Sequence, residues 1–142
     1  MATSNAATTY LENKILDFLF KNNSSSFATP GNSIYVGLAT AVSDAEAGSL
    51  TEATFGSYAR QQVTAANWTL TSASGDTQTV KNAANIEFPA STGTSNTVTH
   101  AFIVDAASSG NILFIGALDA SKTIATGDIF RINTNNLTIE LK

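Results

Sequence analysis

The sequence predicts a mainly β domain, either a β-sandwich or a jelly-roll-like fold of eight or nine short strands with one N-terminal amphipathic helix. Short stretches of alternating apolar and polar residues recur after residue 33, with turn residues between them. A helical pattern precedes them. Only 13% of the 142 residues are charged, about half of the usual ~25%. Ser, Thr and Asn replace the missing charge, which is typical of a β-rich surface.

The length indicates one domain with a real hydrophobic core, spanning residues 1–142. Within it we expect a flexible polar arm over residues 1–8, the helix over 9–21 and the β-sandwich over 33–142. The arm lacks the apolar stretch and positive charge of a signal peptide.

The helix begins with the sequence TYLE, in which Thr9 and Glu12 fit a capping box. An earlier start, capped by Ser4 or Asn5, is the alternative. Apolar residues follow at helical spacing and make a broad stripe that should lie on a sheet or on a neighbouring subunit. The stripe consists of Leu11, Ile15, Leu16, Phe18, Leu19 and Phe20.

Strands are expected where apolar residues alternate between turn signals. The strongest are Val98–Asp105 and Asn111–Leu118, which the short AASSG segment joins as a hairpin. The acidic stretch Val42–Gly56 is expected to be a loop, and Ser74–Asp76 a turn. The remaining strands are expected at residues 33–40, 58–64, 68–72, 79–82, 84–88, 129–133 and 137–141.

Charge and composition exclude several classes of function. The net charge is −4, and the seven Lys and Arg residues are scattered, so neither nucleic acid nor an anionic membrane surface is an expected partner. The longest apolar run is too short to span a bilayer. The chain has no cysteine and one histidine, and it has no glycine-rich phosphate loop. We therefore expect no metal site and no cofactor.

The chain also lacks a recognisable catalytic constellation, and we expect no enzyme. His100 and Asp105 point to opposite faces of a regular strand, so we interpret His100 as a hydrogen-bonded strand residue. Asp44, Glu46 and Glu52 share one acidic stretch. They could bind calcium, but a solvated acidic loop is the favoured interpretation. No converging carboxylate pair for glycoside hydrolysis is visible.

The segment FGSYARQQVTAANW, Phe55–Trp68, is the most distinctive in the chain. Under one hypothesis, Tyr58, Arg60 and Trp68 form a platform for a sugar or a partner chain, because aromatic residues and Arg anchor interfaces. The favoured hypothesis has Tyr58 and Trp68 in the core, while Arg60 binds a carboxylate such as that of Asp105 or Glu46.

Three segments carry a resemblance to a known family: GSYARQQVT, NAANIEFPA and the stretch from VTHAFIVDA to LTIEL. Together with the LENKILDFLF helix and the IYVGLAT strand, they resemble, in order, the small virion structural proteins of tailed bacteriophages. Such proteins are labelled either head decoration (cement) or tail fibre proteins. The resemblance implies no catalytic residues, and it implies a protein of the virion that is assembled in the host bacterial cytoplasm.

The first functional expectation is a capsid decoration protein that binds the major capsid protein or other virion proteins and reinforces the head shell. By analogy with such sites, we expect a homo-oligomer, with a trimer as the guess. The alternative is a tail fibre or tail-associated component that binds a receptor or a carbohydrate. Exposure of Tyr35, Tyr58 or Trp68 would favour this alternative. The expected interface residues are Thr8, Leu11, Ile15, Tyr58, Arg60 and Trp68.

Overall fold

The computed structural model describes residues 5–21, 34–72 and 78–141, and it has a mainly β fold with one N-terminal helix. The turn expected at Ser74–Asp76 lies outside these residues. Every strand pair within them is antiparallel. The elements in chain order are β1 (Ala6–Ala7), α1 (Thr9–Phe20), β2 (Tyr35–Asp44), β3 (Ser49–Glu52), β4 (Gln61–Gln62), the 3-10 helix η2 (Ala65–Asn67), β5 (Trp68–Ser72), β6 (Gln78–Asn82), β7 (Ile86–Glu87), β8 (Asn96–Val104), β9 (Ile112–Ile124), β10 (Arg131–Ile132) and β11 (Thr138–Leu141).

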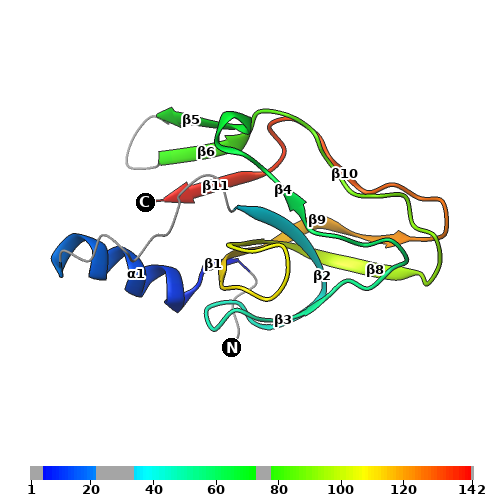
Figure 1. The fold of residues 1–142 in the computed structure, drawn as a ribbon, viewed down its shortest axis with the longest axis horizontal. Coiled ribbons are helices and arrows are strands. Elements are labelled where there is room, and N and C mark those ends of the chain that lie inside the picture. Colours follow the sequence, from blue (N-terminus) through cyan, green and yellow to red (C-terminus); the bar gives the residue numbers. More distant parts are fainter. Residues whose placement is uncertain (1–4, 22–33, 73–77, 142) are drawn as a thin grey trace.

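The strands form one large sheet and two small ones. The large sheet has the order β1-β9-β8-β2-β3, with β4 also paired to β2. A second sheet has the order β11-β6-β5, and β10 pairs with β7. Figure 1 shows the β11-β6-β5 sheet above the large sheet and α1 projecting to one side. The predicted β-sandwich with one N-terminal helix is confirmed, whereas the jelly-roll variant stays a prediction.

The main core lies between the large sheet and the smaller ones, and a second cluster covers the opposite face of the large sheet. Because both faces are covered, the central strands carry continuous apolar runs: residues 36–39 of β2 and 101–104 of β8 are all buried. Gly37 faces Phe102, and a Cβ atom at Gly37 would overlap the Phe102 ring. The largest fully buried apolar side chains of the main core are Val36, Leu38, Phe55, Phe88, Val98 and Ile124, and those of the second cluster are Phe102 and Val104.

The helix is confirmed, but its cap is one residue earlier than the capping box predicts. The Thr8 hydroxyl accepts a hydrogen bond from the Leu11 backbone N–H at 3.3 Å and donates one to the Ile112 carbonyl at 2.5 Å. Thr8 is only 1% exposed. The cap therefore fastens the start of α1 to β9, a tertiary contact that the local sequence does not encode.

The expected free arm over residues 1–8 is wrong for its last four residues. Ala6 and Ala7 form β1, which pairs with Ile115 and Phe114 of β9. The Asn5 side chain accepts a hydrogen bond from the Ala117 backbone N–H at 2.6 Å. Two alanines have no β-strand preference of their own, so this strand exists because the edge of β9 offers partners for its backbone. Residues 1–4 lie outside the described part.

Two other expectations change. The stretch Val42–Gly56 is not a loop throughout, because β2 continues to Asp44 and pairs with β3 around a turn that ends at Gly48 with φ +69°. Asp44 accepts a hydrogen bond from the Ala47 N–H at 3.1 Å in that turn. The strand expected at 58–64 is reduced to Gln61–Gln62, because only these two residues of the range pair with β2.

Candidate functional site

The segment Phe55–Trp68 starts with a turn that directs Tyr58 into the core. The Tyr58 N–H donates to the Phe55 carbonyl at 2.9 Å, and Ser57 adopts a positive φ of 69°. Gly56 is required in this turn because a Cβ atom there would lie 2.5 Å from the Gly93 nitrogen. This close approach of two backbones fixes the position from which the Tyr58 ring enters the main core.

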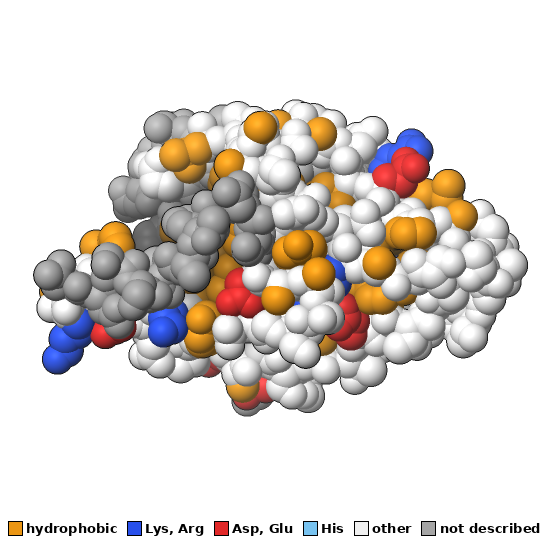
Figure 2. All heavy atoms as spheres, in the orientation of Figure 1, with side chains coloured by type: hydrophobic (Ala, Val, Ile, Leu, Met, Phe, Trp, Pro, Cys, Tyr) orange, Lys and Arg blue, Asp and Glu red, His pale blue; other side chains and the backbone are white. Residues whose placement is uncertain are grey.

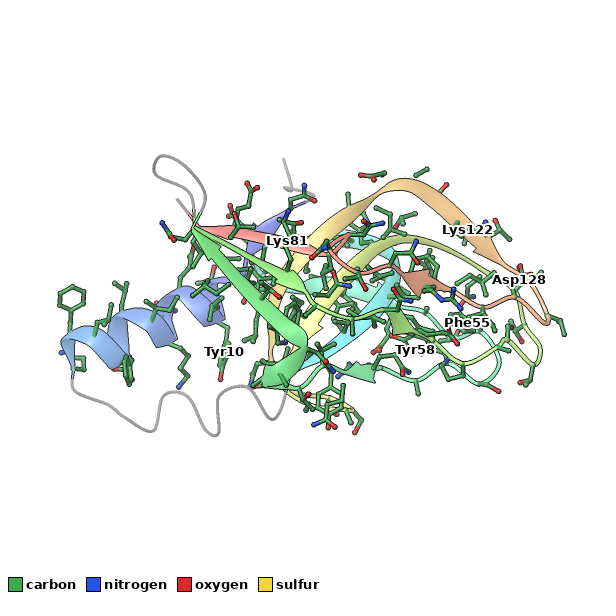
Figure 3. The ribbon with its side chains drawn as sticks, turned by 90° about the horizontal axis from the view of Figure 1, so that it is seen from above. Tyr10, Phe55, Tyr58, Lys81, Lys122 and Asp128 are labelled. Atoms are coloured by element: carbon green, nitrogen blue, oxygen red, sulfur yellow. The ribbon has the colours of Figure 1, made fainter. Side chains whose placement is uncertain are left out.

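Tyr58 combines aromatic packing with two hydrogen bonds. Its ring lies edge-on to Phe55, with centroids 5.2 Å apart, and stacks on Phe88 at 6.0 Å. Figure 3 shows Phe55 and Tyr58 side by side within the fold. The Tyr58 hydroxyl accepts from the Leu38 backbone N–H at 2.9 Å and donates to Glu52 Oε1 at 2.8 Å.

Arg60 joins its own segment to the end of β3 and to the distant β8–β9 hairpin. Its Nε and Nη2 donate to the two carboxylate oxygens of Glu52, each at 2.8 Å. Its Nη1 donates to the carbonyls of Ala106 and Ser109 at 2.9 and 2.6 Å. The guanidinium also lies 5.3 Å from the centroid of the Phe102 ring. We call Glu52, Tyr58, Arg60 and these two carbonyls the Arg60 clamp.

The electrostatics of the clamp favour the charged pair. Burial opposes ionisation of Glu52, but the hydrogen bonds from Arg60 and Tyr58 and the positive charge of Arg60 outweigh it, so the pKa of this carboxyl is lowered. Hydrogen bonding to Glu52 raises the pKa of Arg60. Burial raises the pKa of Tyr58, which stays neutral and keeps the proton that it donates to Glu52.

The contacts of the Arg60 clamp hold parts of the fold together. Four of the five N–H donors of Arg60 have partners within the chain, and its side chain is only 9% exposed. It ties the end of β3 and the segment before β4 to the β8–β9 hairpin. The hypothesis of an internal Arg–carboxylate pair is therefore correct in kind, but the partner is Glu52 rather than Asp105 or Glu46.

Trp68 and Tyr35 do not complete a binding platform. The Trp68 Nε1–H donates to the Val63 carbonyl at 3.2 Å, and the ring packs against the main core, as the Tyr58 ring does. Tyr35 packs against the second cluster. All three aromatic side chains are half-buried, so the structure does not bring Tyr58, Arg60 and Trp68 together as an exposed surface.

The other polar candidates serve turns and strands. Asp105 accepts from the Asn111 N–H at 2.7 Å and thereby closes the β8–β9 hairpin. His100 Nδ1 lies 2.8 Å from the Thr99 hydroxyl, burial lowers its pKa, and its buried Nε2 has no hydrogen-bond partner. Among residues 5–21, 34–72 and 78–141, no three acidic or histidine side chains are grouped to hold a metal ion.

None of the three interface residues expected in α1 and at its N-cap is exposed. Thr8 and Leu11 are buried, and Ile15 is half-buried. The exposed apolar side chains are instead Leu16, Leu19 and Phe20 on the outer side of α1, together with Phe18. The broad apolar stripe in the sequence already contained these residues, but it did not reveal which part would be covered.

An open groove of about 830 Å³ lies between β8 and β9 on one side and β10 and β11 on the other. Its lining mixes apolar side chains, such as Phe114, Leu118 and Ile139, with the carboxylates Asp119 and Glu140. None of the six expected interface residues lines it. No helix in the described part of the chain is long and apolar enough to cross a membrane.

Comparison with known proteins identifies a family. A family model described as "Podophage GP4 fiber I protein gp80" matches residues 6–140, which include α1, the Arg60 clamp and nearly all of β11. No curated protein matches the chain. Since the family model spans almost the whole sequence, the resemblance to small tailed-phage virion proteins is confirmed. The chain belongs to the podophage GP4 fiber I protein gp80 family.

Proposed function

We propose that this protein is a structural, non-catalytic component of a tailed-phage fibre or of the tail region that carries it. The family description names a fibre, so the tail-fibre alternative fits the family better than the capsid decoration role that was the first expectation. The proposed partners are other virion proteins and further copies of the chain.

The Arg60 clamp is the observation that carries this proposal. The most distinctive polar motif of the sequence is used inside the fold, where the Arg60 side chain is 9% exposed and bonded to Glu52 and to two carbonyls of the β8–β9 hairpin. A side chain held in this way has four of its five donors engaged within the chain, and it ties the end of β3 to the β8–β9 hairpin. Stiffness is what a building block of a fibre requires.

The surface chemistry supports the same role. Charged side chains are few on the face drawn in Figure 2, where they lie in small groups. Hydroxyl groups pair across neighbouring strands instead, as Thr97 does with Thr123 at 2.9 Å and Ser43 with Ser49 at 2.7 Å. Hydroxyls form hydrogen bonds at a smaller desolvation cost than charges, which suits surfaces that are covered during assembly.

Receptor binding through the aromatic residues of the sequence motif is not favoured. Tyr58 and Trp68 use their polar atoms within the chain and pack on the main core. A sugar needs an exposed aromatic face, and these rings do not present one. A receptor-binding role for the particle would then belong to another protein or to a surface other than this motif.

The copy number in purified virions tests the proposal. Quantitative mass spectrometry against the major capsid protein should give a ratio far below one, because a phage particle has few tail and fibre positions compared with its shell lattice. A copy number close to that of the capsid protein, a ratio near one, would contradict the fibre proposal and support head decoration. Complete absence from the particle would contradict both.

A further inference from the structure

The outer face of α1 is the largest exposed apolar feature among the described residues. Leu16, Leu19 and Phe20 are 54%, 63% and 78% exposed. They follow the i, i+3, i+4 spacing that places side chains on one face of a helix. Leu11 and Ile15 lie on the adjoining side of the helix, where Leu11 is buried and Ile15 is half-buried. The second half of α1 is therefore apolar on more than one side.

A helix that is apolar nearly all round is normally buried. Both Figure 1 and Figure 3 show α1 extending beyond the ends of the sheets, so the strands that contact its start do not continue along its outer half. The C-terminal half, ILDFLF, thus has the composition of a buried helix at a place where its own sheets do not bury it.

We propose that the face of α1 formed by Leu16, Leu19 and Phe20 packs against the same face of a second copy of this chain. This inference names a partner for the proposed structural role and rests on that role. The proposed interface consists of Leu16, Leu19 and Phe20. The residues expected from the sequence at this end of the chain were Thr8, Leu11 and Ile15.

The exposed area supplies about half of what a standard interface buries. At roughly 200 Å² for each large apolar side chain, the three residues expose about 400 Å² per copy. A standard interface buries about 800 Å² per partner, so this patch and its rim account for a large part of what a stable pair needs. A patch of this size is also within the range that marks functional surfaces on soluble proteins.

Charge favours a second copy at this position. The whole chain has a net charge of −4, but the helix and its C-cap carry Glu12, Lys14, Asp17 and Lys21, which sum to zero. Figure 2 shows both blue and red side chains at this end of the molecule. The net negative charge thus lies elsewhere, so charge on α1 itself does not oppose the approach of a second copy. The groove beside β11 is lined by Asp119, Glu140 and Arg131 and therefore carries a net negative charge.

Sedimentation analysis of the purified chain between about 1 and 100 µM tests the inference directly. The wild-type protein should be oligomeric at the upper end of this range. The double variant Leu19→Glu, Phe20→Glu should be monomeric, because it places like charges opposite each other in an apolar contact. Ile129→Glu is the matched control: Ile129 is 51% exposed, lies outside α1 and should leave the oligomer intact.

A second variant covers the case in which the charged variant does not fold. The chain has no cysteine, so Leu19→Cys introduces its only thiol. Mild oxidation should convert this variant into a disulfide-linked dimer, whereas Ile129→Cys should remain unlinked at the same concentration.

A wild-type chain that stays monomeric throughout, or a Leu19→Glu, Phe20→Glu variant that assembles as well as the wild type, would overturn the inference. If the monomeric chain is nevertheless present in virions, a different virion protein covers α1. In that case self-association fails while the proposed structural role stands.

Discussion

Replacing Arg60 with Leu should destabilise the fold by about 2–4 kcal/mol. The substitution removes both hydrogen bonds to Glu52 and leaves a carboxylate that is only 30% exposed without its cationic partner. It also removes the donors for the Ala106 and Ser109 carbonyls. The estimate lies below the 3–5 kcal/mol of a fully buried broken pair because Glu52 retains some contact with water.

Urea unfolding measures this change. Trp68 is the only tryptophan and packs on the main core, so its fluorescence reports the loss of that core, and far-ultraviolet circular dichroism gives an independent probe. Arg131→Leu is the matched control. The Arg131–Glu87 pair has side chains that are 48% and 47% exposed, and its loss should cost no more than about 1 kcal/mol.

A double-mutant cycle with Arg60→Leu and Glu52→Gln isolates the interaction between these two side chains from their contacts with other groups. We expect a coupling free energy of about 1–3 kcal/mol. If Arg60→Leu costs no more than Arg131→Leu, the clamp does not stabilise the fold, and the structural interpretation of the GSYARQQ segment is wrong.

Three further predictions concern the same region. Tyr58→Phe leaves the Leu38 N–H and Glu52 each without one hydrogen-bond partner and should cost about 1–3 kcal/mol in urea unfolding. The lowered pKa of Glu52 means that its contribution to stability is present above its ordinary value of 4.5 and is lost as the pH falls through its folded value. Wild-type stability should therefore decrease more steeply below about pH 4.5 than that of Glu52→Gln, and parallel curves would contradict the assignment. Gly37→Ala should lower the melting temperature by several degrees, a cost of at least about 1–3 kcal/mol, because its methyl group overlaps the buried Phe102 ring; an unchanged melting temperature would show that the ring can move.

The predictions that depended on local patterns were the successful ones. The strand Trp68–Ser72 and the β8–β9 hairpin follow from alternation and turn residues, which act within a few residues of each other. The β2–β3 hairpin was missed although its turn has Asp44 at the start and Gly48 at the end, a signal that the sequence does contain.

The remaining errors came from contacts between separate segments. The Thr8 cap depends on a carbonyl of β9, 104 positions away, and β1 depends on the free edge of β9. The identity of the Arg60 partner was equally hidden: several carboxylates were available, and the two backbone carbonyls that complete the clamp carry no side-chain signal. The guanidinium group of Arg60 indicated that this residue would bind a carboxylate within the fold. Which carboxylate it binds depends on how the strands are arranged.

Gold labelling of intact virions with an antibody against this chain is the most direct test of the central claim. The account predicts label on the tail or its fibres, at few positions per particle, and a bare head surface. Label distributed over the head shell would contradict it and would identify the protein as a decoration of the capsid.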